Sequence, residues 1–177
     1  LSVYLDGQVT DKPEKEQLTK LLLKDSLNLN NSSLTDLNPL VKFSRLRYLS
    51  ISNNQIKSLS PIENLNSLSV LEAMDVGLNS VKSIMRLKKL KKLNLAQNQL
   101  SEAQFLQLSQ LNSLSEINVN KTGIEKATVK KFLSQKATEC TVIYDKEGLS
   151  AWWTDLDNTW QAIFKLQFPM SNSPTQK

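Results

Sequence analysis

The sequence of 177 residues contains no histidine and a single cysteine, Cys140. Without histidine it lacks the commonest general base and metal ligand, and one cysteine allows neither an internal disulfide nor a thiolate zinc site. Only four glycines occur, none in a phosphate-binding motif, and no apolar run is long enough to span a membrane. We therefore expect no cofactor and no enzymatic activity. Cys140, whose pKa the adjacent Glu139 would raise, is interpreted as a small core residue.

The sequence does contain a repeated apolar pattern, L-x-x-L-x-L-x-x-N-x-L. Its copies begin at positions 24, 46, 68, 90 and 114, so the step is 22 residues three times and then 24. The longer step implies an insertion of two residues between Leu100 and Leu114. Each copy predicts a short strand. We expect parallel strands in one curved sheet, near residues 26–29, 48–51, 70–73, 92–95 and 116–119.

Between the strands, apolar residues recur at every third position, as in Ile56, Leu59, Ile62 and Leu65. This spacing is typical of a tight helical turn. Each unit thus joins a strand to a return arm, and both have an apolar side that faces inward. Because one unit cannot bury that side alone, at least three units must stack to make a continuous core.

The pattern resembles the leucine-rich-repeat family, specifically its class of 22-residue repeats. The segments 36–40 and 58–62 resemble the D-[IL]-x-P-L turns of bacterial internalin-like proteins. The resemblance implies an α/β solenoid, a right-handed superhelix with a curved parallel sheet, a cap at each end and a partner bound on the concave sheet. Ser32, Val76 and Thr122 replace the Asn of the motif, so we expect looser turns at those three positions.

The resemblance covers residues 24–144, which we expect to form five repeats and a terminal strand. Residues 1–23, with a strand at 3–5 and an amphipathic helix, are the expected N-terminal cap. All three tryptophans lie in residues 145–168, the expected aromatic C-terminal cap; an exposed partner-binding patch is the alternative. Residues 169–177 have the composition of a linker or tail. The Trp-rich segment is similar to links between repeat blocks in large bacterial surface proteins.

Residues that flank the core positions of each strand point away from the core and would tile the concave sheet. Four basic residues oppose four acidic ones there, which disfavours a nucleic-acid site, and Tyr48, Val70 and Met74 form its one apolar spot. We predict that a protein, peptide or glycan docks on this surface. The candidate contact residues are Tyr48, Ser50, Val70, Glu72, Met74, Lys92, Asn94, Glu116 and Asn118.

An alternative site is a basic patch within eleven residues that include no acid. Its members are Lys82, Arg86, Lys88, Lys89, Lys91 and Lys92. A polyanionic glycan, a phospholipid surface or nucleic acid would suit such a patch, although the absence of interleaved aromatics disfavours single-stranded nucleic acid. The structural alternative is a solvated face that keeps the protein soluble.

Two functions remain once an enzyme is disfavoured. The first is a binding module, and the second is an architectural spacer block within a larger tandem-repeat surface protein. The internalin-like turns favour a bacterial cell-surface or secreted protein, with a cytoplasmic adaptor as the alternative. The chain begins at Leu1 rather than Met, which we interpret as a processed product or a piece of a longer protein. We expect it to be a monomer.

Overall fold

The structure is a computed structural model that describes residues 3–5, 8–10 and 15–144. The N-terminal part contains β1 (Val3–Leu5) and β2 (Gln8–Thr10), which pair as an antiparallel hairpin, and α1 (Lys15–Leu22). The strand predicted at 3–5 is confirmed. The Trp-rich segment 145–168 and the tail 169–177 lie outside the described residues.

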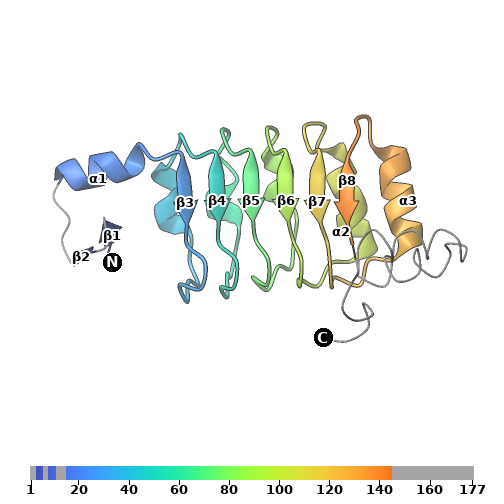
Figure 1. Ribbon diagram of the computed structural model, residues 1–177, viewed down its shortest axis with the longest axis horizontal. Coiled ribbons are helices and arrows are strands. Elements are labelled where there is room, and N and C mark those ends of the chain that lie inside the picture. Colours follow the sequence, from blue (N-terminus) through green and yellow to red (C-terminus); the bar gives the residue numbers. More distant parts are fainter. Residues whose placement is uncertain (1–2, 6–7, 11–14, 145–177) are drawn as a thin grey trace, which may run out of the picture.

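Six strands form one parallel sheet in chain order, as the equally directed arrows of Figure 1 show. They are β3 (Ser26–Asn28), β4 (Tyr48–Ser50), β5 (Val70–Glu72), β6 (Lys92–Asn94), β7 (Glu116–Asn118) and β8 (Thr141–Ile143). The first five are the predicted repeat strands, each shorter by one residue at its carboxyl end. The register pairs Leu27, Leu49, Leu71, Leu93, Ile117 and Val142 in one row. The period of the sequence therefore fixes which residues are neighbours across the sheet.

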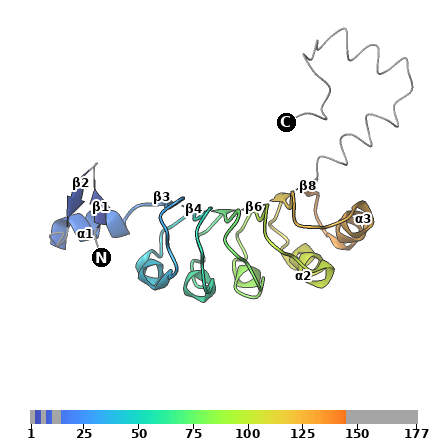
Figure 2. The same cartoon turned by 90° about the horizontal axis from the view of Figure 1, so that it is seen from below.

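The return arms carry short helices on one side of the sheet. They are η1 (Asn38–Lys42), η2 (Ser60–Ile62), η3 (Ile84–Arg86), α2 (Glu102–Gln107), η4 (Leu108–Gln110) and α3 (Lys126–Gln135), where η denotes a 3-10 helix. The 3-10 helices confirm the tight turns predicted from the three-residue spacing. The predicted insertion holds α2, which begins with a capping box between Ser101 and Gln104. Figure 2 shows two layers, with the sheet on the inner side of a gentle curve.

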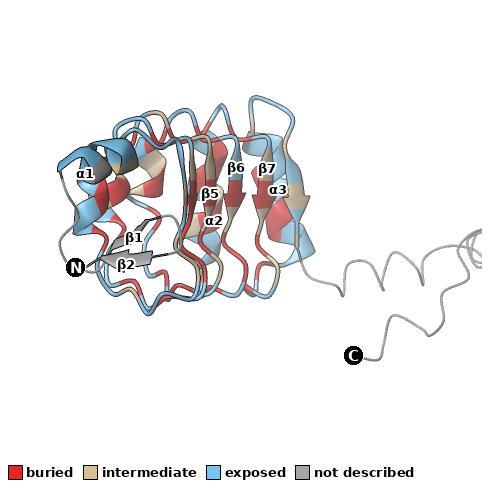
Figure 3. Cartoon of the chain, turned by 60° about the vertical axis from the view of Figure 1, so that its left-hand side comes forward, coloured by how far each residue is buried: buried red, intermediate tan, exposed pale blue. Residues whose placement is uncertain are grey.

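The core lies between these two layers, where the buried residues of Figure 3 gather. The central strand leucines Leu49 and Leu71 are fully buried, and the rings of Phe105 and Phe132 stack with centroids 4.5 Å apart. Burial is weaker at the N-terminal end, where Leu18 and Leu22 of α1 remain 40% and 37% exposed. A cap over that end, like the right-handed superhelix, stays a prediction.

Two buried asparagines join the turns that follow the strands. Asn54 donates from Nδ2 to three backbone carbonyls, including that of Leu29 in the preceding repeat at 2.9 Å. Its Oδ1 accepts from the backbone N–H groups of Ser32 and Leu34 at 3.1 and 2.9 Å. One side chain thus satisfies groups in two successive turns, which buried backbone requires.

Asn98 makes the same set of five bonds two repeats later. Its Oδ1 accepts from the N–H groups of Val76 and Leu78, both at 3.1 Å, and its Nδ2 donates to Ala73 and two further carbonyls. The turns at Ser32 and Val76, expected to be loose, are therefore closed by the asparagine of the following repeat. For these two turns the expectation was wrong, because the asparagine serves the preceding turn as well as its own. At the third position the hydroxyl of Thr122 donates to the carbonyl of Val119 within its own turn.

The backbone confirms that two kinds of turn alternate. In all five turns the residue before the Asn position has a φ between 49° and 60°: Asn31, Asn53, Asp75, Gln97 and Lys121. Where the asparagine is missing, the residue after that position is left-handed too, namely Ser33, Gly77 and Gly123 with φ of 51°, 68° and 80°. Such angles favour glycine. Turns with asparagine and turns with a second left-handed residue therefore follow one another.

Replacing Asn98 by Ala should lower the free energy of unfolding by about 2–4 kcal/mol, because several buried backbone groups of the preceding turn lose their partner. Urea denaturation measures the loss. Gln99→Ala, at the exposed neighbouring position, is the control and should change it by less than about 0.5 kcal/mol. Equal effects of the two variants would show that the Asn98 side chain does not hold the turns together.

Candidate functional site

The surface of the sheet that faces away from the return arms, here called the sheet face, carries two rows of side chains. The register aligns Ser26, Tyr48, Val70, Lys92, Glu116 and Thr141 in the first row. It aligns Asn28, Ser50, Glu72, Asn94, Asn118 and Ile143 in the second. Eight of the nine predicted contact residues belong to these rows, and Met74 lies just beyond the second. Neighbouring strands are about 4.8 Å apart, so six strands span about 24 Å.

Ser50 is a correction to the predicted site. Its side chain is only 1% exposed, because its hydroxyl donates to Oδ1 of Asn30 at 2.6 Å. The same oxygen accepts from the backbone N–H of Ser52 at 2.7 Å. Alternation along the strand places Ser50 on the sheet face, but the side-chain amide of Asn30 in the preceding repeat bonds to its hydroxyl and covers it. Ser50 therefore supports the surface and is not available to a partner.

The polar residues of the sheet face are held by contacts between strands. Lys92 forms an ion pair with Glu116, with Nζ and Oε2 2.8 Å apart, and this hydrogen bond raises the pKa of the Lys92 ammonium. Asn94 donates to Oε2 of Glu72 at 2.8 Å. Within a single repeat, Oδ1 of Asn118 accepts from the backbone N–H of Asn120 at 3.0 Å. These side chains form a preorganised polar surface.

The predicted apolar spot divides into two parts. Tyr48 and Val70 are direct partners across β4 and β5, and both are half-buried. Met74 is also half-buried, but Glu72 lies between it and Val70 on the same side of the chain. The contiguous apolar element of the sheet face is therefore the pair of Tyr48 and Val70.

The predicted basic patch is dispersed by the fold. Lys92 lies on the sheet face, in its ion pair, and Lys82 lies on a return arm. Lys88, Lys89 and Lys91 lie together in the loop between η3 and β6, with Arg86 at the end of η3. Residues close in sequence thus reach three different surfaces, because each repeat travels once around the solenoid.

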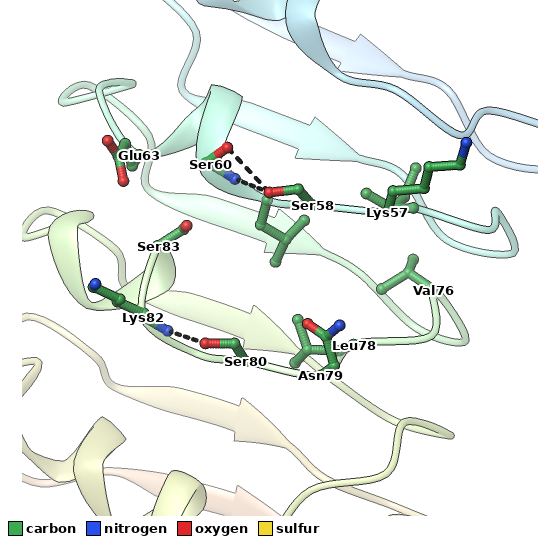
Figure 4. Close-up of a pocket in the computed structure, with 12 residues that line it drawn as sticks. Lys57, Ser58, Ser60, Glu63, Val76, Leu78, Asn79, Ser80, Lys82 and Ser83 are labelled. Carbon is green, nitrogen blue, oxygen red and sulfur yellow. Dashed lines mark hydrogen bonds between the residues drawn. The ribbon is translucent and has the colours of Figure 1, made fainter.

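A hollow of about 290 Å³ lies between the second and third return arms, with Lys82 at its rim (Figure 4). Its wall carries four serines, and two of them are already engaged with the backbone. The hydroxyl of Ser58 accepts from the N–H of Ser60 at 3.1 Å, and that of Ser80 accepts from the N–H of Lys82 at 3.2 Å. These bonds close local turns. We therefore interpret the hollow as the gap between two packed return arms rather than as a binding site.

Cys140 is the single cysteine, which the sequence analysis interprets as a small core residue. It is half-buried against the core, just before β8. Burial raises the pKa of its thiol, and the negative charge of Glu116 contributes in the same direction against the opposing effect of Lys136. The predicted direction of this pKa shift is confirmed, although Glu116 across the sheet acts rather than the adjacent Glu139.

Within the described part of the chain, no group of three or more Cys, Asp or Glu side chains is placed to hold a metal ion. The helices described there are also too short or too polar to cross a membrane.

Several solved structures resemble this chain. Internalin C2 of Listeria monocytogenes shares 24% identity over 74% of this chain and 56% of its own, with a TM-score of 0.62. A second Listeria monocytogenes internalin, inlF, shares 22% identity over 75% of this chain and 37% of its own, with a TM-score of 0.60. A leucine-rich-repeat protein of Leptospira interrogans shares 20% identity over 71% of this chain and 38% of its own, with a TM-score of 0.55.

These likenesses and the six-stranded parallel sheet establish the fold: the chain is a leucine-rich-repeat solenoid, similar in fold to the two internalins and the Leptospira protein. It spans between about a third and a little over half of the length of these structures. No family model matches the sequence, and no curated protein matches it.

The environment of Cys140 predicts a slow reaction with iodoacetamide. Because the pKa of the thiol is raised, less thiolate is present at pH 7, and the rate should reach half its maximum above the pH of about 8.5 found for free cysteine. Alkylation followed by mass spectrometry across pH 6–10 gives this midpoint. In 8 M urea the midpoint should return to that of free cysteine. A native midpoint below 8.5 would contradict the assigned environment.

Proposed function

We propose that this chain is a non-catalytic binding module that presents its sheet face to a protein, peptide or glycan partner. The observation that carries the proposal is the half-buried pair of Tyr48 and Val70, set in a surface that the return arms leave open. An aromatic ring held by neighbouring strands loses little conformational freedom when a partner covers it. Tyrosine is enriched among residues that dominate binding energy.

The polar contacts around this pair support the same proposal. The Lys92–Glu116 ion pair and the Glu72–Asn94 hydrogen bond fix four side chains before any partner arrives. A preorganised surface pays less ordering entropy on association. Among the strand residues one basic side chain faces two acidic ones, a net charge of −1, so affinity should depend only weakly on salt.

We place the module on a bacterial cell surface or among secreted proteins, because the proteins of similar fold include internalins. That it acts as a monomer stays a prediction. The alternative is an architectural spacer block in a larger tandem-repeat protein. This alternative is supported by the coverage, since the chain matches only part of each similar structure. The two proposals differ in one respect: a spacer has no partner for its sheet face.

The test is to find a ligand for the intact chain with a glycan array and a displayed library of extracellular protein fragments. Tyr48→Ala and Val70→Ala should each weaken the strongest ligand by at least about 10-fold. Val41→Ala provides a matched control, because Val41 is 49% exposed on the η1 return arm. It should leave affinity unchanged.

A ligand lost with Val41→Ala and retained with Tyr48→Ala would contradict the sheet-face proposal. The screens are run up to about 1 mM, a concentration that still detects weak specific complexes. If neither screen finds a ligand, the result favours the spacer.

A further inference from the structure

The edge of the sheet at which the strands begin, at the top of Figure 1, gathers cations from loops that are far apart in sequence. Two loops contribute them, 42–47 before β4 and 86–91 before β6. Three positions are basic in both loops: Lys42 matches Arg86, Arg45 matches Lys89, and Arg47 matches Lys91, each pair 44 residues apart. All six side chains are exposed. We call this set the basic edge.

The backbone register shows how these cations are spaced. The N–H of Ser69 donates to the carbonyl of Arg47 at 2.8 Å, and the N–H of Lys91 donates to that of Ser69, also at 2.8 Å. Arg47 and Lys91 therefore lie in one row, two strands apart. Two strand spacings are about 10 Å. The cations thus form two columns, with the uncharged loop before β5 (residues 64–69) between them.

The neutral loops have their own repeat. Residues 65–69 and 111–115 are both Leu-Asn-Ser-Leu-Ser, so loops with serine alternate with loops with cations. The hydroxyl of Ser69 donates to the carbonyl of Arg47 at 3.0 Å, and that of Ser115 to the carbonyl of Lys91 at 3.2 Å. The serines thus hold the backbone beside each column of cations.

The charge on this edge is not compensated locally. The loops before β4, β5, β6 and β7 contain no acidic residue from 42 to 47, 64 to 69, 86 to 91 or 110 to 115. Among the described residues the single ion pair is Lys92–Glu116, which involves none of the six cations. An open hollow of about 540 Å³ lies at the start of the edge, lined by Arg45, Arg47, Ser67 and Lys24, with Asp25 as its one acid.

We propose that the basic edge binds a sulfated polysaccharide chain, which crosses the strands from the hollow toward β6. Arginine forms paired hydrogen bonds with an oxyanion, and lysine adds point charge. The serine hydroxyls beside the columns can donate hydrogen bonds to, and accept them from, the hydroxyl groups of a sugar chain. The one aromatic residue among the six cations, Phe43, is buried in the core and offers no ring for a base to stack on, which argues against single-stranded nucleic acid. The leucines between them, Leu46 and Leu90, are fully buried, and the one apolar residue that lines the hollow is Leu23, which is 53% exposed. The edge is thus mainly cationic, which favours a polyanionic chain over an apolar membrane surface.

This site is separate from the sheet face and does not depend on the function proposed for it. The fold supplies a conservative test variant, because serine already occupies the matching positions in the neutral loops. Replacing Arg45, Arg47, Lys89 and Lys91 by Ser converts both basic loops to the neutral type. The matched control replaces four exposed cations elsewhere, Lys57, Lys82, Lys126 and Lys130, by Ser and removes the same charge.

Binding of a heparin decasaccharide to the intact chain is measured by isothermal titration calorimetry at several salt concentrations. We expect the edge variant to lose on the order of 30-fold in affinity at 0.1 M salt and to flatten the salt dependence. The control should retain most of the affinity. Circular dichroism and thermal melts confirm that both variants are folded.

Three results would overturn the proposal: equal losses in the two variants, no binding of heparin by the unaltered chain, or tighter binding of another polyanion. A 15-nucleotide oligothymidylate and vesicles with phosphatidylserine serve as the competing probes. Hyaluronan, which has carboxylates but no sulfates, should bind more weakly than heparin. The Tyr48→Ala variant should bind heparin like the unaltered chain, so failure of the sheet-face site and failure of this site are distinguishable.

Discussion

The buried amides of Asn54 and Asn98 are the interaction on which the surface of this protein depends. Each bonds the backbone of its own turn and of the turn before it, so two repeats cannot slide past each other without leaving buried groups unpaired. The strands are only three residues long and carry few ladder bonds of their own. Backbone bonds between repeats continue past the strand ends, as from the N–H of Asn53 to the carbonyl of Met74. Between β3 and β4 and between β5 and β6 the asparagines add side-chain bonds that fix the register, and with it the order of side chains in each row.

The alternation of turn types is matched by an alternation of surface chemistry. The two asparagine turns follow β4 and β6, and the two loops of the basic edge precede the same strands. The turns with Gly77 and Gly123 follow β5 and β7, which are preceded by the neutral serine loops. The structural unit of this solenoid is accordingly a pair of repeats. A charge placed once per pair recurs every second strand, at a spacing of about 10 Å.

The sequence predicted the strands, the 3-10 arms and the terminal strand well, because apolar spacing records which side chains must be buried. The insertion between Leu100 and Leu114 was also predicted, although not that it forms the helix α2. The burial of Ser50 could not be predicted, because it results from a hydrogen bond to Asn30 across the sheet rather than from the pattern within one strand. The closed conformation of the Val76 turn was not predicted for the same reason, because the side chain that closes it, Asn98, lies 22 residues away.

The candidate sites show the same division. The sheet-face residues follow from alternation along each strand, and all but Ser50 remain half-buried or exposed. The basic edge was seen only in part, because a linear reading of Lys82 to Lys92 joined residues that the solenoid separates. It missed Lys42, Arg45 and Arg47, which lie before β4 as their counterparts Arg86, Lys89 and Lys91 lie before β6. Comparing residues 44 positions apart would have found them.

Amide hydrogen exchange of the intact chain tests the central claim that buried asparagines hold the repeats in register. The N–H groups of Val76 and Leu78 donate to the Asn98 side chain. They should therefore exchange as slowly as strand amides such as that of Leu71, through global unfolding alone. If Val76 and Leu78 exchange within seconds while Leu71 stays protected, the turns open independently of the sheet and the asparagines do not set the register.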